Sequence, residues 1–421
     1  MNKYYLIISL AVIIFIGSYS IFSAGYEVED FNSNDEETVI APEEKERDEG
    51  AENNKEEQSV VVKENDEEID KDDEDDEKSL ENLIGTGEGL ESNPNSLVDC
   101  NYKLQTIPSP KAVEHRPNSK EAWVSSLMNK DFGVFVIDLE SRRVKSRIQL
   151  PDGGGVEITF NDDGSLGYVS QMETGRVFEI NSKKKEIERV IETGGSWTKV
   201  VKVSNGKLFA SNWSSNNISI IDLDTEETEI VPTTTTPRGI YVDGDYLYVA
   251  GFQSGEIVRH DLKEGSFETL ITTGGAMRHL VGTNDYVYGS DMGLGKIFRV
   301  EKSSGEVEEF AETENNPNTI RFTDDEKVLA VSNRGINHQS GNYNIPGPEW
   351  GSVLFYDAES GKLLDVVVGG NQPTGLSIYE NELMYSNFLD GDLVFCDLPE
   401  SEHLLEGSTQ KTETYKEKII K

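Results

Sequence analysis

Between residues 108 and 398 the chain repeats one pattern of apolar and polar positions seven times. In each copy, short runs of β-branched and aromatic residues alternate with polar turns that carry glycine. A polar or small residue begins a loop in every copy, at spacings of 45, 41, 39, 40, 42 and 54 residues: Ser126, Gln171, Asn212, Gly251, Asp291, Asn333 and Asn387. A period of about 40 residues with several short strands per copy is typical of a β-propeller. The pattern therefore predicts an all-β, seven-bladed β-propeller.

The fourth copy indicates how one repeat becomes one blade. Four apolar runs follow one another there: Ile240–Val242, Tyr246–Ala250, Glu256–Asp261 and Phe267–Ile271. Asp243-Gly244-Asp245, between the first two runs, favours a hairpin turn. We therefore expect four antiparallel strands in each blade. A sandwich of unrelated short strands is the alternative, but it does not account for seven aligned copies.

The two ends of the repeat region predict how the propeller closes. The seventh copy, Pro373–Leu398, supplies only three strands, and an unpaired edge would remain. The strand at Leu97–Leu104 precedes the first copy and is expected to become the missing fourth strand. Cys100 and Cys396 would then face each other across the seam, which predicts a disulfide between them. Two buried free thiols are the alternative.

Several copies resemble the YVTN family of surface β-propeller repeats. The first half of that repeat is matched by Pro117–Ser126, by Phe322–Asn333 and by Lys207–Asn212. Its second half is matched by Val134–Asp138 and by Ile218–Asp222. The resemblance covers about 300 residues and implies a surface-layer-like seven-bladed propeller, although Gln171 and Gly251 depart from the motif. It says little about activity, since related propellers include surface proteins, binding platforms and a few enzymes.

Composition divides the chain into four parts. Residues 1–26 contain one early cation, Lys3, and the apolar run Tyr4–Phe22, and we interpret them as a membrane anchor or a cleaved signal peptide. Residues 27–95 form an acidic linker, residues 96–400 the propeller and residues 401–421 a polar C-terminal tail. Either reading of the first part places the propeller outside the cytoplasm, anchored by an N-terminal helix or secreted.

Negative charge is concentrated before the propeller. Between Glu27 and Glu91 there are 28 Asp and Glu residues against 6 Lys and Arg, which is a net charge of −22 out of −40 for the chain. Such a segment buries too little apolar surface to fold, so we expect a disordered spacer. A cation-binding or partner-binding tail is the alternative. The acidic balance argues against a nucleic-acid partner, because phosphate contacts need clustered Lys and Arg.

Three consecutive copies place a cation at the same position, at the start of the innermost strand: Lys199, Arg238 and Arg278. Large or charged residues follow the loop positions or lie in the insertion of copy six, among them Trp213, Phe252, Arg334, Phe388 and Trp350. Loops of a propeller surround its central channel, so these residues predict an anion-binding pocket at the channel mouth. The ligand would be a carboxylate, an anionic sugar or a peptide C-terminus. The alternative is that the cations pair with nearby acids and the aromatic residues shield contacts between blades.

No catalytic or phosphate-loop motif is present, and the five His residues form no spaced metal motif. We therefore expect no cofactor and no metal site. The favoured function is a noncatalytic binding or envelope-interaction module at the cell surface, monomeric, with a cell-surface protein, a glycan or a small anion as its partner. The alternative is a secreted propeller lyase or lactonase-type hydrolase with a metal-assisted site, for which His279 and Glu157 would be the catalytic pair.

Overall fold

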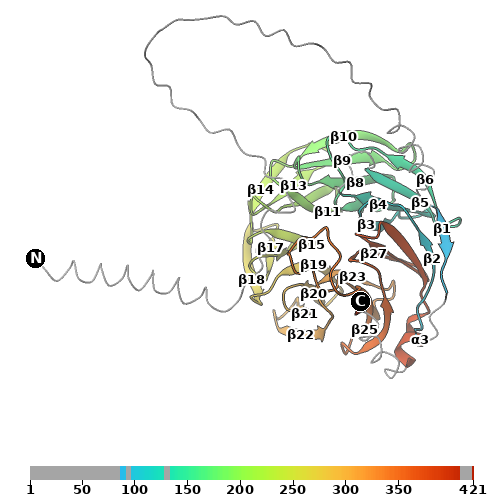
Figure 1. Cartoon of the computed structure of the whole chain (residues 1–421). Helices are drawn as coiled ribbons and strands as arrows, with labels where there is room; N and C mark the ends of the chain where they lie inside the picture. Colours follow the sequence, from blue (N-terminus) through green and yellow to red (C-terminus); the bar gives the residue numbers. More distant parts are fainter. Residues whose placement is uncertain (1–85, 92–95, 128–132, 408–419) are drawn as a thin grey trace, which may run out of the picture. The chain divides into compact units, whose positions relative to one another are not determined.

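A computed structural model of the chain describes residues 86–91, 96–127, 133–407 and 420–421. Nearly all of the regular structure in these residues is β-strand, arranged as seven antiparallel sheets. The sheets stand side by side around a central axis as the blades of a propeller (Figure 1). The predicted all-β, seven-bladed propeller is confirmed.

The first three blades each contain four strands that pair in sequence order. Blade one consists of β3 (Pro110–His115), β4 (Glu121–Ser126), β5 (Val134–Asp138) and β6 (Arg143–Ile148). Blade two consists of β7 (Ile158–Phe160), β8 (Leu166–Gln171), β9 (Arg176–Asn181) and β10 (Glu186–Glu192). Blade three consists of β11 (Thr198–Ser204), β12 (Lys207–Asn212), β13 (Asn217–Asp222) and β14 (Thr228–Pro232).

The next three blades repeat the same order. Blade four consists of β15 (Pro237–Asp243), β16 (Tyr246–Gly251), β17 (Glu256–Asp261) and β18 (Ser266–Thr272). Blade five consists of β19 (Met277–Gly282), β20 (Tyr286–Asp291), β21 (Lys296–Glu301) and β22 (Val307–Glu312). Blade six consists of β23 (Pro317–Phe322), β24 (Val328–Asn333), β25 (Ser352–Asp357) and β26 (Leu363–Val368). Every predicted loop position is the last residue of the second strand of its blade.

Blade seven joins the two ends of the repeat region. It consists of β27 (Pro373–Tyr379), β28 (Glu382–Asn387) and β29 (Asp392–Asp397), followed by β2 (Asp99–Leu104) and β1 (Gly87–Gly89) from upstream of the first blade. The predicted closure by an N-terminal strand is confirmed. The fifth strand, β1, lies within the segment expected to be a disordered linker. It pairs with β2 through its backbone, and its three residues carry no apolar pattern that could have indicated a strand.

Cys100 and Cys396 lie opposite each other where β2 pairs with β29, and they form the predicted disulfide. The bond joins positions that are 296 residues apart in sequence. Asp365 on β26 holds the segment before β2 as well, because its carboxylate accepts hydrogen bonds from the backbone nitrogens of Leu97 and Val98 at 2.7 and 2.8 Å. The N-terminal side of the propeller is therefore tied to both of the last two blades.

The apolar core lies between neighbouring blades rather than in one central mass. Trp123 of blade one is fully buried, and its ring meets the edge of Phe160 of blade two at a centroid distance of 4.9 Å. The innermost strand of each blade contacts that of the next, and β27 contacts β3, so the circle of blades is closed. These inner strands line the central channel.

The predicted polar C-terminal tail begins with a short helix, α3 (Ser401–Glu406). Leu404 of this helix is completely buried in the core cluster of blades six and seven. The Ser401 hydroxyl donates a hydrogen bond to Asp325 at 2.8 Å. Leu405 packs against the same cluster, so two apolar side chains and a hydrogen bond dock this segment, which is too short to show a helical period in the sequence.

No helix within the described parts of the chain is long and apolar enough to cross a bilayer. The membrane anchor or signal peptide predicted at residues 1–26, and all of the acidic linker before residue 86, lie outside the described residues.

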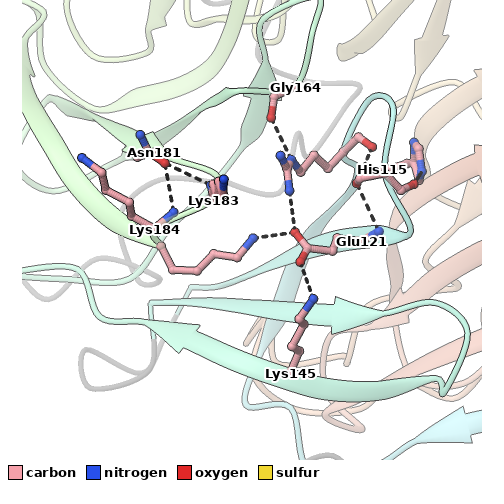
Figure 2. A network of polar contacts seen from close by, with 10 residues as sticks. His115, Glu121, Lys145, Gly164, Asn181, Lys183 and Lys184 are labelled. Carbon is pink, nitrogen blue, oxygen red and sulfur yellow. Dashed lines mark hydrogen bonds and ion pairs between the residues drawn. The ribbon is translucent and has the colours of Figure 1, made fainter.

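A buried carboxylate connects blades one and two on their outer side. Glu121, at the start of β4, accepts contacts from Lys185 at 2.5 Å and from Lys145 and Arg116 at 2.9 Å each. Figure 2 shows the dashed contacts converging on its carboxylate. Although burial opposes ionisation, hydrogen bonds from the three cations lower the pKa of Glu121 to about 2. The pKa of Lys185 also falls, because burial of its ammonium outweighs the attraction of Glu121.

Removing the disulfide should destabilise the propeller without changing its fold. Replacing Cys100 and Cys396 together with Ala should lower the free energy of unfolding by about 2–5 kcal/mol, because the unfolded chain regains the freedom of a long loop. Chemical denaturation under non-reducing conditions measures the difference. Equal stability of the two proteins would contradict a structural role for the bond.

The Glu121 cluster should make stability depend on pH. The pKa of Glu121 in the folded state lies below its ordinary value of 4.5, so its contribution is complete above that value and is lost as the pH falls toward 2. Glu121→Gln should therefore cost about 3 kcal/mol at neutral pH and progressively less below pH 4.5. Urea denaturation across this range tests it, with the exposed Glu140→Gln as the control. A cost that is independent of pH would contradict the assignment.

Candidate functional site

The central channel brings together the three cations that the repeat alignment singled out. Lys199 on β11, Arg238 on β15 and Arg278 on β19 all line it. Lys199 and Arg278 are buried, with 9% and 5% of their surface exposed, and Arg238 is half-buried. Three neighbouring blades therefore direct positive charge toward the same space.

Two further cations lie near these three, and one of them, Lys111, lines the same space. Lys111 on β3 holds the equivalent position in blade one and is 9% exposed, and Arg334, directly after β24, is 2% exposed. The sequence contained a signal for Lys111, because Pro110-Lys111 corresponds to Pro237-Arg238 of the fourth copy. We refer to the five residues as the cation cluster: Lys111, Lys199, Arg238, Arg278 and Arg334.

The large residues after the loop positions alternate with the cations around the channel. Lys199 lies between two such residues, with its Nζ 2.5 Å from the Met172 sulfur and 5.2 Å from the centroid of the Trp213 ring. The Arg238 guanidinium lies over both Trp213 and Phe252, at 5.3 and 5.7 Å from their centroids. Cation–π contacts of this kind stabilise a buried positive group by about 0.5–2 kcal/mol each. The aromatic residues thus hold the cations in place.

The other members of the cation cluster have similar neighbours. Lys111 Nζ lies 5.3 Å from the centroid of the Phe388 ring. Arg278 donates a hydrogen bond to the Asn318 side-chain oxygen. Arg334 donates one to the Gln372 side-chain oxygen at 2.6 Å. The candidates Trp213, Phe252 and Phe388 therefore contact the cations, and the candidate Arg334 is itself one of them.

Trp350, like those four residues, is not among the side chains that line the narrow space itself, and its own contacts lie elsewhere. Its ring packs against the apolar cluster of blades five and six, and the Lys421 ammonium lies 4.4 Å from its centroid. The same ammonium contacts the Gly347 carbonyl oxygen at 2.9 Å. The structure thus places Trp350 beside the C-terminal residue.

A backbone hydrogen bond that repeats from blade to blade fixes the position of the large residue that follows each loop position. In six blades, the nitrogen of this residue donates to the carbonyl of the residue directly before the innermost strand, as Phe252 does to Thr236 at 3.0 Å. The acceptor residue has a left-handed backbone in five blades although it is never Gly there: Ser109, Trp197, Thr236, Asn316 and Gln372. Such a conformation costs non-Gly residues energy and persists only where surrounding contacts determine it. The backbone of this rim is therefore fixed.

Serine hydroxyls of one blade hold the backbone at the channel positions of the next blade, including those of Lys199 and Arg238. The hydroxyl of Ser211, in the second strand of blade three, accepts a hydrogen bond from the Val200 nitrogen at 3.0 Å. It also donates one to the carbonyl of Arg238, in the next blade, at 2.9 Å. Five blades repeat this double contact, each time reaching the aligned channel position of the following blade: Ser125, Ser170, Ser211, Ser290 and Ser332.

Burial and neighbouring positive charge both act on the Lys111 ammonium. The pKa of the Lys111 ammonium lies well below its ordinary value of 10.5, first because the group is buried and then because the other four members of the cluster repel its charge. Like charges in a poorly hydrated space raise each other's energy.

Deeper in the channel the charges are mixed. Glu114 accepts an ion-pair contact from Arg321 at 2.7 Å. Burial raises the pKa of Glu157, with Lys202 and Arg321 acting in the opposite direction. Burial also lowers the pKa of His279 well below its ordinary value, and its Nδ1 accepts a hydrogen bond from the Ile320 nitrogen at 3.5 Å.

His279 and Glu157, the pair that the enzymatic alternative requires, both line the channel. No hydrogen bond between the two side chains is present among the contacts of the described residues. Within the same residues, no group of three His, Cys, Asp or Glu side chains could hold a metal ion. The open space between the lining side chains is about 30 Å³, enough for water or a small ion but not for a sugar ring.

Comparison with known proteins identifies one relative by sequence. The chain is 28% identical over 309 residues to Antigen Lp49 of Leptospira interrogans serogroup Icterohaemorrhagiae serovar copenhageni (strain Fiocruz L1-130), a match that covers 68% of this chain and 67% of that protein. No family model matches, so membership of the YVTN family stays a prediction.

Solved structures with similar folds are diverse. Hydrazine synthase of Kuenenia stuttgartiensis superposes with a TM-score of 0.59 at 16% identity, covering 69% of this chain and 96% of that chain. The Cps50 (Swd1) β-propeller domain of Myceliophteria thermophila gives 0.58 at 11% identity, covering 72% and 100%. The designed protein Ika8 gives 0.52 at 11% identity, covering 75% and 99%. These similarities show the fold alone.

Loss of one bridging hydroxyl should affect both stability and the site. Ser211→Ala leaves the Val200 nitrogen and the Arg238 carbonyl without that partner, so the free energy of unfolding should fall by about 1–3 kcal/mol. Chemical denaturation measures the loss, and exposed Ser266→Ala on β18 is the control. If the two variants were equally stable, the hydroxyl would not be the element that ties blade three to blade four.

Proposed function

We propose that this protein is a noncatalytic binding propeller that acts outside the cytoplasm and holds an anionic group at the mouth of its central channel. The cation cluster carries the proposal. The chain has a formal net charge of −40, yet four members of the cluster, from four different blades, line one narrow space, and the fifth, Arg334, lies near enough to repel the charge of Lys111. Positive groups gathered around one space attract a ligand of opposite charge.

The chemistry of the cluster suits an anion. Arg238 and Arg278 carry planar guanidinium groups, which bind carboxylate or phosphate oxygens through two parallel hydrogen bonds. Lys199 adds a compact positive charge that can approach an oxygen from another side. Because the fixed backbone of the rim and the aromatic contacts already hold these groups, little entropy is lost when a ligand arrives.

Three observations support a location outside the cytoplasm. The Cys100–Cys396 disulfide is typical of an oxidising compartment. The apolar run at Tyr4–Phe22 is suited to export or anchoring. The similarity to a protein named as an antigen agrees with exposure at a cell surface. A cell-surface protein or glycan that presents an anionic group would then be a natural partner, and a monomeric propeller is sufficient to bind it.

The enzymatic alternative has less support in the geometry. His279 accepts a hydrogen bond from the Ile320 nitrogen, and Glu157 shares the deeper part of the channel with Lys202 and Arg321. Neither side chain is oriented by the other, as a base and its orienting group would be. We therefore assign the channel a binding role.

Removing charge from three members of the cluster tests the proposal. The full-length protein should bind at least one of citrate, inorganic phosphate and heparin, and should not bind the neutral sugar maltose, as measured by isothermal titration calorimetry. The triple variant Lys199→Gln, Arg238→Gln and Arg278→Gln should reduce the affinity at least a hundredfold, because each lost charge-assisted contact is worth about 1.5–3 kcal/mol.

A matched control carries Lys183→Gln, Lys184→Gln and Lys207→Gln, which remove three exposed positive charges and should leave the affinity unchanged. If the native protein bound none of the three anions, or if the channel variant and the control behaved alike, the proposed function would be wrong.

A further inference from the structure

A groove of about 570 Å³ opens between blades two and three. It lies on the face of the propeller opposite the cation cluster, because Lys199 stands at the start of β11 whereas Asn205, which lines the groove, follows the end of that strand. We propose that the groove is a docking site for a lysine side chain on a basic segment of a partner protein. The groove and the channel have no lining residue in common, so the inference goes beyond the proposed function.

The corresponding space between blades four and five is filled by a lysine of the protein itself. Lys302 directly follows β21, and its ammonium contacts the Asp243 carboxylate at 2.6 Å and the Tyr241 hydroxyl at 3.1 Å. The same ammonium lies 4.9 Å from the centroid of the Tyr241 ring. A lysine of blade five therefore finds a carboxylate and an aromatic ring on the preceding blade.

A second lysine fills the junction between blades one and two with the same chemistry. Lys185 of blade two contacts the Glu121 carboxylate of blade one and lies 5.2 Å from the centroid of the Trp123 ring. It occupies a left-handed position, with φ of 62°, in the turn between the third and fourth strands of its blade. At both junctions an ammonium from one blade meets an aromatic ring and a carboxylate of the blade before it, and both kinds of contact favour a cation.

Blade three carries neither of these lysines. Leu223 directly follows β13, as Lys302 follows β21, and Glu226 holds the left-handed turn position that Lys185 holds in blade two. The groove nevertheless keeps the other half of the arrangement. It is lined by the aromatic ring of Tyr168 and by four carboxylates, and no lysine is among its lining residues in the described part of the chain: Asp162, Glu179, Glu188 and Asp224.

Two of the four carboxylates already have a cation of the protein as a partner. The Arg189 guanidinium, which also lines the groove, contacts Glu179 at 2.6 Å and Glu226 at 3.0 Å. Its single charge is therefore shared between two carboxylates. Glu188 contacts the exposed Lys184 at 3.4 Å. The charge available to a ligand thus comes from the other two lining carboxylates.

The remaining lining residues suit both parts of a lysine side chain. Asp162 and Asp224 are exposed, and neither carboxylate contacts a cation among the residues that the structure describes. Leu166, Val203 and Leu223 are half-buried and add apolar surface. A lysine can pack its hydrocarbon stem against such surface while its ammonium meets a carboxylate. The volume exceeds that of one side chain, so the neighbouring residues of a protein segment can enter as well.

Carbodiimide cross-linking of hexalysine to the full-length protein, read by mass spectrometry, tests the site. The reagent joins a lysine amine to a carboxylate in contact with it as an amide, with loss of water, so each cross-link reports its own position. This separates the groove from the general attraction of a polycation to a chain of net charge −40. Asp162 and Asp224 should react about tenfold more than Glu140 and Glu264, which are exposed elsewhere.

One substitution should close the groove by supplying the missing lysine. Leu223→Lys places an ammonium where Lys302 stands in blade five, so cross-linking at Asp162 and Asp224 should fall about tenfold. Leu262→Lys is the matched control. Leu262 directly follows the third strand of blade four and is half-buried like Leu223, and its replacement should leave cross-linking in the groove unchanged.

Three results would overturn the inference: groove carboxylates that react no more than Glu140 and Glu264, equal cross-linking in the Leu223→Lys and Leu262→Lys variants, or competition by spermidine as strong as that by unlabelled hexalysine. The last result would assign the groove to a small polyamine instead of a protein segment. Binding of anions in the channel is measured separately and involves none of these residues, so the inference and the proposed function can fail independently.

Discussion

The site depends on a hydrogen bond that crosses from one blade to the next. A serine hydroxyl near the end of a second strand accepts a hydrogen bond from the backbone of the innermost strand of its own blade. It also donates one to a backbone carbonyl of the next blade, as Ser211 does between the Val200 nitrogen and the Arg238 carbonyl. The inner strands are irregular at this level, since the register of β11 against β12 shifts between Thr198 and Val201. The hydroxyl fills the gap that the shift opens. The carbonyl it reaches belongs to the residue whose side chain enters the channel, so the bond that joins the blades also fixes the cation.

This arrangement allows an acidic protein to maintain a positive site. Several cations outside the channel form ion pairs, as around Glu121. Aromatic, thioether and amide groups are among the contacts that orient the channel cations. Because the circle is closed by β2 and by the Cys100–Cys396 bond, the inner strands that carry these cations are held at a fixed separation. Stability of the seam and chemistry of the channel are thus coupled.

Much of the fold could be predicted because a propeller repeats itself. The loop positions, the strands of the fourth copy and the pairing of Cys100 with Cys396 all follow from aligned copies of one unit. The features that were missed do not repeat. Strand β1 pairs with β2 and forms one ion pair, between Glu88 and Lys103, and α3 docks mainly through Leu404 and Leu405. Lys111 was overlooked although its local sequence matches, because the first copy begins where the repeat pattern itself begins.

The most direct test of the central claim, an anion seated among cations from several blades, is a crystal structure of the protein grown with selenate, whose selenium scatters anomalously. The account predicts an anomalous peak in the central channel within hydrogen-bonding distance of Lys111 and Arg238, with sulfate reducing the peak by competition. An empty channel in crystals that bind selenate elsewhere would contradict it.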